Sequence, residues 1–204
     1  MASSARFESR DLARIAIFAA IIVVLGVAGQ VPLPVGVPIT LQTLGVMLAG
    51  IVLGPVRGAA AVLVVLLLAA VGLPVLSGGR GGLDVFFGPT VGYMIGWIPG
   101  VILTGLLARS GRTRGADPVW WRVALGAIVG GIGVVYAFGV PGVALVVGIP
   151  LADAAVSSLV FLPGDLAKAV VATVLALALW RAYPPAFALA PAAPRAGESV
   201  PAAR

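Results

Sequence analysis

A carboxylate and an amine lie inside the last long apolar run of this sequence, in the stretch Phe161–Lys168 (FLPGDLAK). If a helix begins near Pro163, Asp165 and Lys168 are three residues apart on one of its faces. Ionisable side chains at membrane depth are costly and are rarely found there without a partner or a task. The pair therefore has two interpretations. It binds a polar ligand, or Lys168 reaches the nearest interface while Asp165 caps its helix.

The composition is that of an integral membrane protein. Of the 204 residues, 61% are hydrophobic and 10% are charged, whereas a soluble domain carries about 25% charged residues. Long continuous apolar runs favour helices over a β-barrel. The absence of cysteine and histidine from the sequence excludes disulfides, a Cys/His zinc site and a Ser-His-Asp arrangement. The arginines lie in short loops between apolar runs, which indicates membrane topology and not nucleic-acid binding.

We expect six membrane-spanning helices, whose apolar runs cover approximately residues 12–28, 41–53, 59–71, 88–108, 123–138 and 162–180. The second and third runs are separated by Gly54–Gly58, which contains a proline and an arginine and predicts a tight turn. The first run could also be a signal peptide, but the later runs are equally hydrophobic, so we interpret it as an uncleaved span. The predicted fold class is therefore an all-α membrane bundle.

The arginines predict the orientation of this bundle. Six spans place 11 of the 12 arginines on one side and leave Arg80 on the other. The positive-inside rule makes the arginine-rich side cytoplasmic. We therefore expect both termini in the cytoplasm, with residues 1–11 as the N-terminus, 12–182 as the membrane domain and 183–204 as a disordered tail. Val143–Val160 then lies at the outer surface as an interfacial helix.

This topology brings polar residues of the outer loops close to the Asp165–Lys168 pair. Lys168 lies about five residues, or roughly 7–8 Å, into the last helix. Arg80 and Asp84 belong to a glycine-rich loop above it, which lacks the spacing of a phosphate-binding motif. The candidate ligand-binding residues are Gln42, Thr43, Arg80, Asp84, Thr90, Tyr93, Asp165 and Lys168. An apolar pocket with these groups suits a small ligand that is part hydrocarbon and part polar. We expect no catalytic residue, metal site or cofactor.

Four stretches of the chain resemble the biotin-binding BioY family, the S-components of energy-coupling factor (ECF) transporters. They are Val37–Gly50 (VPITLQTLGVMLAG), Gly72–Val75 (GLPV), Gly88–Tyr93 (GPTVGY) and Phe161–Lys168. These stretches occur in the expected order across most of residues 12–182. One departure is Val91, where the family pattern GPTGGY has glycine, and we expect this valine to narrow the pocket near Tyr93.

The resemblance implies a six-helix bundle in the bacterial cell membrane that binds biotin near its outer face, with Gln30–Thr40 as a lid. It also implies two kinds of partner, a transmembrane coupling protein and a pair of ATPases, so that ATP hydrolysis is done by separate subunits. The small-residue stripe Ala13, Ala16 and Ala20 of the first helix would dock against them, although packing within the chain is the commoner use of such a stripe. The alternatives are an S-component for another small vitamin and a stand-alone biotin carrier.

The family's last-helix Asp and Lys correspond to Asp165 and Lys168. Biotin offers a ureido group with two N–H donors and one carbonyl acceptor, an apolar ring and chain, and a carboxylate. Our hypothesis is that Asp165 accepts from a ureido N–H and that Lys168 donates to the ureido oxygen or to the carboxylate. Arg80 would bind whichever anionic end faces the loops.

Overall fold

The structure, a computed structural model, describes residues 8–28, 30–31, 39–110 and 117–187. Within these ranges the chain is helical except for its connections and two short strands, β1 (Gln30–Val31) and β2 (Ile39–Thr40), which pair antiparallel. The longer helices are α1 (Ser9–Ala28), α2 (Gln42–Leu53), α3 (Pro55–Ala70), α4 (Val91–Arg109), α5 (Trp120–Ile128), α6 (Val135–Val147), α7 (Leu151–Ser158) and α8 (Leu162–Ala182). Four short segments complete them, namely the π-helix η2 (Val129–Val134) and the 3-10 helices η1 (Leu83–Phe87), η3 (Leu159–Phe161) and η4 (Pro184–Phe187).

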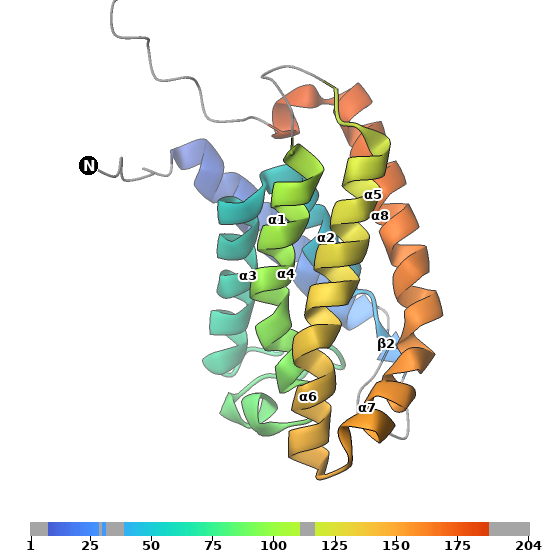
Figure 1. Ribbon diagram of the computed structural model, residues 1–204. Helices are drawn as coiled ribbons and strands as arrows, with labels where there is room; N and C mark the ends of the chain where they lie inside the picture. The colour runs from blue at the N-terminus through green and yellow to red at the C-terminus, as the bar shows by residue number, and fades with distance from the viewer. Residues whose placement is uncertain (1–7, 29, 32–38, 111–116, 188–204) are drawn as a thin grey trace, which may run out of the picture.

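The helices pack lengthwise into one bundle, with α2 and α4 at its centre (Figure 1). α2 contacts α1, α3, α4 and α8, while α4 contacts α3, α5 and α6. Almost every residue of α2 is buried. α5, η2 and α6 form one continuous helix, and α7 leads through η3 into α8. An all-α bundle is therefore confirmed.

One end of the bundle, uppermost in Figure 1, holds the start of α1, the α2–α3 turn, the end of α4, the start of α5 and the end of α8. We call it the arginine end, because its described arginines are Arg10, Arg14, Arg57, Arg109, Arg122 and Arg181. The opposite end holds β2, η1 and α7, and we call it the pocket end. Among the described residues, Arg80 is the one arginine that belongs to a connection at the pocket end.

The predicted turn between the second and third helices is confirmed. Gly54 has a φ of 81°, a left-handed value that a side chain would strain. Pro55 follows at the first position of α3, where its missing N–H costs no hydrogen bond. The chain reverses at this point, so α2 and α3 are packed against each other.

The prediction that the fifth helix ends at Phe138 is wrong. The helix continues through Pro141 to Val147 and ends at Gly148, whose φ of 74° is a left-handed cap. The glycines in this stretch serve close packing. A Cβ on Gly142 would lie 2.7 Å from the Cα of Gly92, so α4 and α6 touch through backbone at that point. Prolines are tolerated in membrane helices because neighbouring groups satisfy the freed backbone carbonyl. The predicted interfacial segment is thus divided between the end of α6 and the short helix α7.

In the part of the chain that the structure describes, three helical runs are long and apolar enough to cross a membrane: Val91–Arg109, Trp120–Val147 and Leu151–Ala182. α2 and α3 are shorter apolar helices. These runs agree with a membrane protein, while the count of six spans and their orientation stay predictions.

The two termini and the predicted lid are described only in part. Of the tail predicted to be disordered, Pro184–Phe187 form η4, and Phe187 is buried with its ring 5.2 Å from that of Trp180. Residues 188–204 lie outside the described residues, as do residues 1–7. The predicted lid Gln30–Thr40 is described only at its ends, as β1 and β2.

Candidate functional site

A pocket at the pocket end of the bundle gathers residues from β2, α2, α4, η3, α8 and two connections. Its described lining is Thr40, Gln42, Thr43, Leu76, Ser77, Arg80, Thr90, Tyr93, Met94, Trp97, Phe161, Asp165 and Lys168. Apolar and aromatic side chains alternate with hydroxyl, amide and charged groups. This is the composition of a site for a small organic ligand with polar groups at defined positions.

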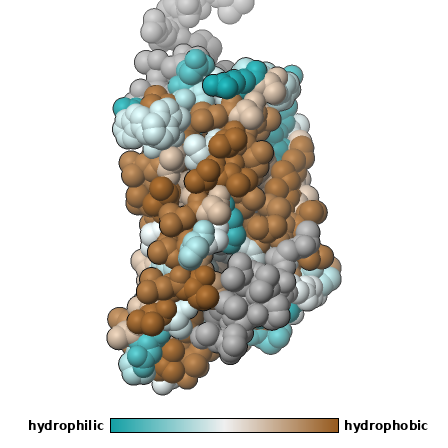
Figure 2. Space-filling model, turned by 90° about the vertical axis from the view of Figure 1, so that its right-hand side faces the viewer, coloured by the Kyte–Doolittle hydropathy of each residue, from teal (hydrophilic) through white to brown (hydrophobic). Residues whose placement is uncertain are grey.

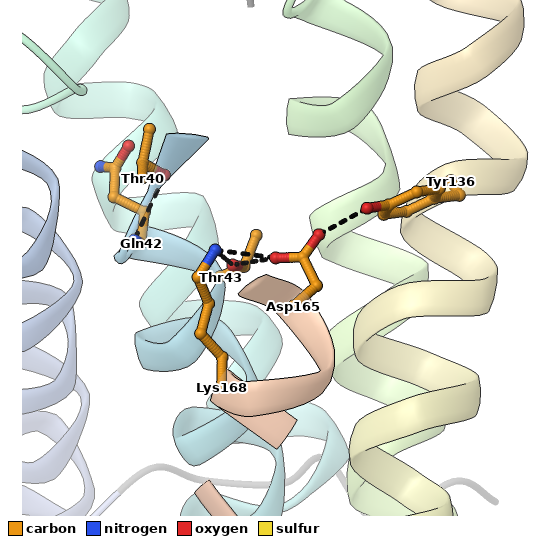
Figure 3. Close-up of polar contacts among 6 residues, drawn as sticks. All are labelled: Thr40, Gln42, Thr43, Tyr136, Asp165 and Lys168. Carbon is orange, nitrogen blue, oxygen red and sulfur yellow. Dashed lines mark hydrogen bonds and ion pairs between the residues drawn. The ribbon is translucent and has the colours of Figure 1, made fainter. Parts of the chain in front are cut away.

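Asp165 and Lys168 form a buried ion pair in this pocket, with Lys168 Nζ 2.7 Å from Asp165 Oδ1 (Figure 3). Their residues are only 5% and 8% exposed. Pro163 occupies the first turn of α8, as expected, and places the pair on one helix face. Small residues Ala169, Ala172 and Ala176 continue that face, and α8 packs there against α2 and α5.

Two hydroxyl groups from other helices complete the coordination of the carboxylate. Thr43 on α2 accepts from Lys168 Nζ at 3.2 Å and donates to Asp165 Oδ1 at 3.3 Å. Tyr136 on α6 donates to Asp165 Oδ2 at 2.7 Å. Figure 3 shows the Asp165 carboxylate between the amine of Lys168 on its own helix and the hydroxyl groups of Thr43 on α2 and Tyr136 on α6. Each carboxylate oxygen has two lone pairs and an ammonium has three donors, so Oδ2 and Nζ each retain capacity for a ligand.

Three aromatic rings form a wall beside the ion pair. The ring of Tyr93 meets those of Tyr136 and Phe161 edge-on, at centroid distances of 5.8 Å and 6.3 Å. The Tyr93 hydroxyl is 2.9 Å from Ser158 Oγ on α7, which itself donates to the carbonyl of Ala154. The wall therefore offers an apolar surface while its hydroxyl groups are held by protein partners.

The glycine-rich connection after α3 lines one side of the pocket through Leu76, Ser77 and Arg80. We call this connection the roof. Gly78 and Gly79 have φ values of 74° and 69°, which make a tight turn and lead to Arg80. The Arg80 Nε donates to the carbonyl of Ser77 at 3.2 Å. This turn explains the glycines without a phosphate-binding role.

Gln42 holds this roof in place. Its side chain is buried, donates from Nε2 to the carbonyl of Val75 at 3.2 Å and accepts at Oε1 from the Ser77 N–H at 3.2 Å. The first turn of α2 is thus hydrogen-bonded to the roof through Gln42 and to the Asp165–Lys168 pair through Thr43. The Gln42 amide has its oxygen and its nitrogen both bonded to backbone, so its main contribution is to position the roof.

Seven of the eight predicted binding residues line the pocket, and Asp84 does not. Asp84 is exposed on η1, the 3-10 helix that follows Gly82. Val91 also differs from expectation. It packs against the hydrophobic core and is not among the described lining residues, so the valine does not narrow the pocket.

Sequence reasoning missed Tyr136 and Trp97. Both are large side chains with a polar atom inside apolar runs, and such groups need a hydrogen-bond partner when buried. That signal could have marked them as site candidates. Tyr136 finds its partner in Asp165, whereas Trp97 lines the pocket with its Nε1 buried.

Two buried polar atoms of the pocket lining have no hydrogen-bond partner among the residues that the structure describes. They are Ser77 Oγ and Trp97 Nε1, in residues that are 3% and 5% exposed. An unpaired buried polar group costs about 1–3 kcal/mol. A ligand with polar groups in this pocket would relieve that cost.

Comparisons with known proteins agree with this description. The model of the BioY family matches residues 1–185. The biotin transporter BioY of Rhizobium etli is 51% identical over 180 residues, which are 87% of this chain and 96% of that protein. The biotin transporter BioY of Rhodobacter capsulatus is 48% identical over 187 residues, 87% of this chain and 97% of that protein. A crystal structure of the S-component for biotin from an ECF-type ABC transporter matches with a TM-score of 0.79 and 33% identity, covering 88% of this chain and 95% of that one.

Proposed function

This chain belongs to the BioY family, and we propose that it takes up biotin across the cytoplasmic membrane of a bacterial cell, as the substrate-binding component of an ECF-type transporter. Its function is transport and not catalysis. The observation that carries the binding site is the buried Asp165–Lys168 pair, which lines a pocket together with unpaired polar atoms of Ser77 and Trp97.

The pocket favours a ligand-binding role for the ion pair over a structural one. Lys168 is 8% exposed and bonds to Asp165 and Thr43, so it does not extend to the interface. Asp165 accepts from side chains of three residues, and no side-chain cap is formed at the start of α8. Both features of the structural alternative are therefore absent from the described contacts.

Biotin complements the donors and acceptors that remain. The second lone pair of Asp165 Oδ2 can accept a ureido N–H, and the third N–H of Lys168 can donate to the ureido oxygen or to the carboxylate. The aromatic wall and Trp97 suit the thiophane ring and the valeryl chain. Arg80, in the roof, lines the pocket, its Nε bonds to Ser77, and we assign its terminal nitrogens to the anionic end of biotin. Asp84 has no part in this scheme.

The distribution of arginines supports an orientation with the pocket outside. The described arginines other than Arg80 belong to the arginine end, which the positive-inside rule assigns to the cytoplasm. α1, α2, α3, α4, the continuous α5–α6 helix and α8 would then be six spans, with both termini cytoplasmic and the pocket open to the outer face.

The first helix offers a surface for the partner subunits. Ala13, Ala16 and Ala20 are exposed, while Ala19 is buried in the core. The stripe therefore faces outward, and small residues allow a second helix to approach closely. We propose that the transmembrane coupling protein binds here and that a pair of ATPases supplies the energy.

Binding of labelled biotin to the detergent-purified protein tests the site. Asp165→Asn should weaken binding by at least about 30-fold, because a buried charge pair loses about 2 kcal/mol or more when one partner is removed. The matched control is Asp153→Asn, which changes an exposed carboxylate at the same end and should bind as the parent does. Equal affinity in the two variants would reject the assignment, and a parent protein without binding that excess unlabelled biotin displaces would reject biotin as the ligand. Stronger displacement by another unlabelled vitamin than by biotin would favour an S-component for that vitamin.

A further inference from the structure

The end of α6 and the helix α7 expose an unusual amount of apolar surface at the pocket end. Leu145 is 83% exposed, the highest value among the large hydrophobic residues that the structure describes, and Val156 is 67% exposed. We call this surface the apolar ledge and define it by its residues, which are Leu145, Val147, Leu151, Val156, Leu159 and Val160. Helix ends that meet water would instead carry polar side chains.

Helix length shows that the ledge lies beyond the hydrocarbon core of a membrane. The run Trp120–Val147 has 28 residues, of which the first three include two tryptophans and Arg122, residues typical of an interface. The remaining 25 residues span about 37 Å at 1.5 Å per residue, against about 30 Å for the core. The end of α6 therefore extends about 7 Å past the core for a helix along the membrane normal, and about 5 Å at the average tilt of about 20°.

A second helix gives the same level independently. α8 has 21 residues, about 32 Å, and crosses the core by itself. α7 and η3 precede it in one helical run of 32 residues, so they also lie past the core at the pocket end. Figure 1 places the end of α6 and α7 at the lower end of the bundle.

The ledge is nevertheless too apolar to stand in water. Residues 143–162 contain one charged side chain, Asp153, where a water-facing segment of this length would carry about five. The same continuous helix also exposes apolar side chains nearer the arginine end, among them Ile128 and Phe138. In Figure 2 hydrophobic atoms cover most of the visible side of the molecule and continue toward its lower end.

We infer that the apolar ledge is inserted into the lipid interface at the pocket end, at the boundary between headgroups and acyl chains. Such segments lie about 5–10 Å into this boundary, which matches the distance of about 5–7 Å by which α6 overreaches the core. The partner is therefore phospholipid. The opposite face of α7 and η3 buries Ala154, Ser158 and Phe161, so one short helix separates this lipid from the aromatic wall of the pocket.

Spin labelling tests this inference, because the sequence has no cysteine and each single-cysteine variant carries one label. Leu145→Cys and Val156→Cys probe the ledge at exposed positions. Val174→Cys, on the exposed side of α8, is the reference for the hydrocarbon core. Glu8→Cys, exposed before α1, is the reference for water. Collisions with dioxygen, which partitions into lipid, and with a water-soluble nickel chelate are measured in phosphatidylcholine liposomes.

The ratio of oxygen to nickel accessibility should be several-fold higher at both ledge positions than at Glu8→Cys, and lower than at Val174→Cys. A ratio at the ledge equal to that of Glu8→Cys would place it in water and overturn the inference. Labels shielded from both reagents would show that a protein chain, a second copy included, covers the ledge, which would also overturn it. The measurement uses no ligand, so its result is independent of biotin binding.

Discussion

Each end of the bundle buries an ion pair, and the two pairs are built differently. At the pocket end, Asp165 and Lys168 lie three residues apart on α8 at 2.7 Å. At the arginine end, Asp11 of α1 bonds to Arg57 of α3 at 2.8 Å and 2.9 Å. The first pair lies within one helix and lines a pocket. The second joins two helices, and neither of its residues is among those that line this pocket.

This difference in construction indicates different roles for the two buried pairs. In the pair at the arginine end, the bonds between Asp11 and Arg57 hold α1 and α3 together. In the pair within one helical turn both charges belong to α8, and its links to α2 and α6 are made through the neutral hydroxyl groups of Thr43 and Tyr136. Its charges are therefore available to a ligand. The comparison predicts that changes at the two ends affect different measurements.

The largest effect is expected for Lys168→Met, which removes the cation of the pocket pair. Asp165 would then be buried without its charged partner, and the ligand would lose a charge-assisted donor. We expect biotin affinity to fall by about 30-fold or more, which corresponds to about 2–5 kcal/mol. Equilibrium binding of labelled biotin measures this. A variant that folds and binds biotin as the parent does would contradict the role of the pair.

The counterpart at the other end is Arg57→Met, which leaves Asp11 with Arg14 at 3.7 Å. Breaking a buried pair costs about 3–5 kcal/mol, but the Arg57 side chain is 19% exposed, so we expect about 1–3 kcal/mol of stability to be lost. Thermal unfolding in detergent should show a lower midpoint, while the folded fraction binds biotin with unchanged affinity. A loss of biotin affinity with an unchanged unfolding midpoint would show instead that the Asp11–Arg57 pair supports binding and not stability.

Tyr136→Phe tests how much one hydroxyl group contributes to the orientation of Asp165 in the pocket. It removes one donor to Asp165 Oδ2 and keeps the aromatic ring against Tyr93. The carboxylate would be less well oriented, so we expect about a fivefold loss of affinity, or about 1 kcal/mol. Thermal stability should change little. An unchanged affinity would mean that the ligand itself holds Asp165 in position.

The sequence predicts features that depend on local spacing and misses those that depend on packing between helices. Asp165 and Lys168 are three positions apart (i, i+3), which places them on one face of any helix, so that pair was predictable. Asp11 and Arg57 meet only because α1 packs on α3, and neither spacing nor composition indicates that contact. The same reason hid Tyr136, whose partner is on another helix.

Glycine misled the prediction in one place for a related reason. Gly139 and Gly142 look like a helix break in the sequence, yet they are the positions where α6 approaches α4. A Cβ on Gly139 would lie 2.4 Å from the ring of Tyr93. In a membrane bundle a glycine pair therefore marks a close contact as readily as a loop, and only the neighbouring helix decides between the two.

The smallest effect is expected for Gln42→Leu, which releases the roof from α2 by removing the bonds to Val75 and Ser77. If Gln42 acts by positioning Arg80, its effect on biotin affinity should be about threefold and should vanish when Arg80 is already alanine. A double-mutant cycle with Arg80→Ala, followed by equilibrium binding of biotin, measures this coupling.

Biotin methyl ester separates the two ways in which this cycle could fail. If Arg80 holds the biotin carboxylate, Arg80→Ala and Gln42→Leu should each weaken binding of biotin but not of the ester, which has no anion to bind. Additive effects in the cycle would show that Gln42 acts independently of Arg80, by touching the ligand or by supporting α2. Equal losses for biotin and its ester would instead assign Arg80 to the ureido end, leaving Lys168 as the group that meets the carboxylate.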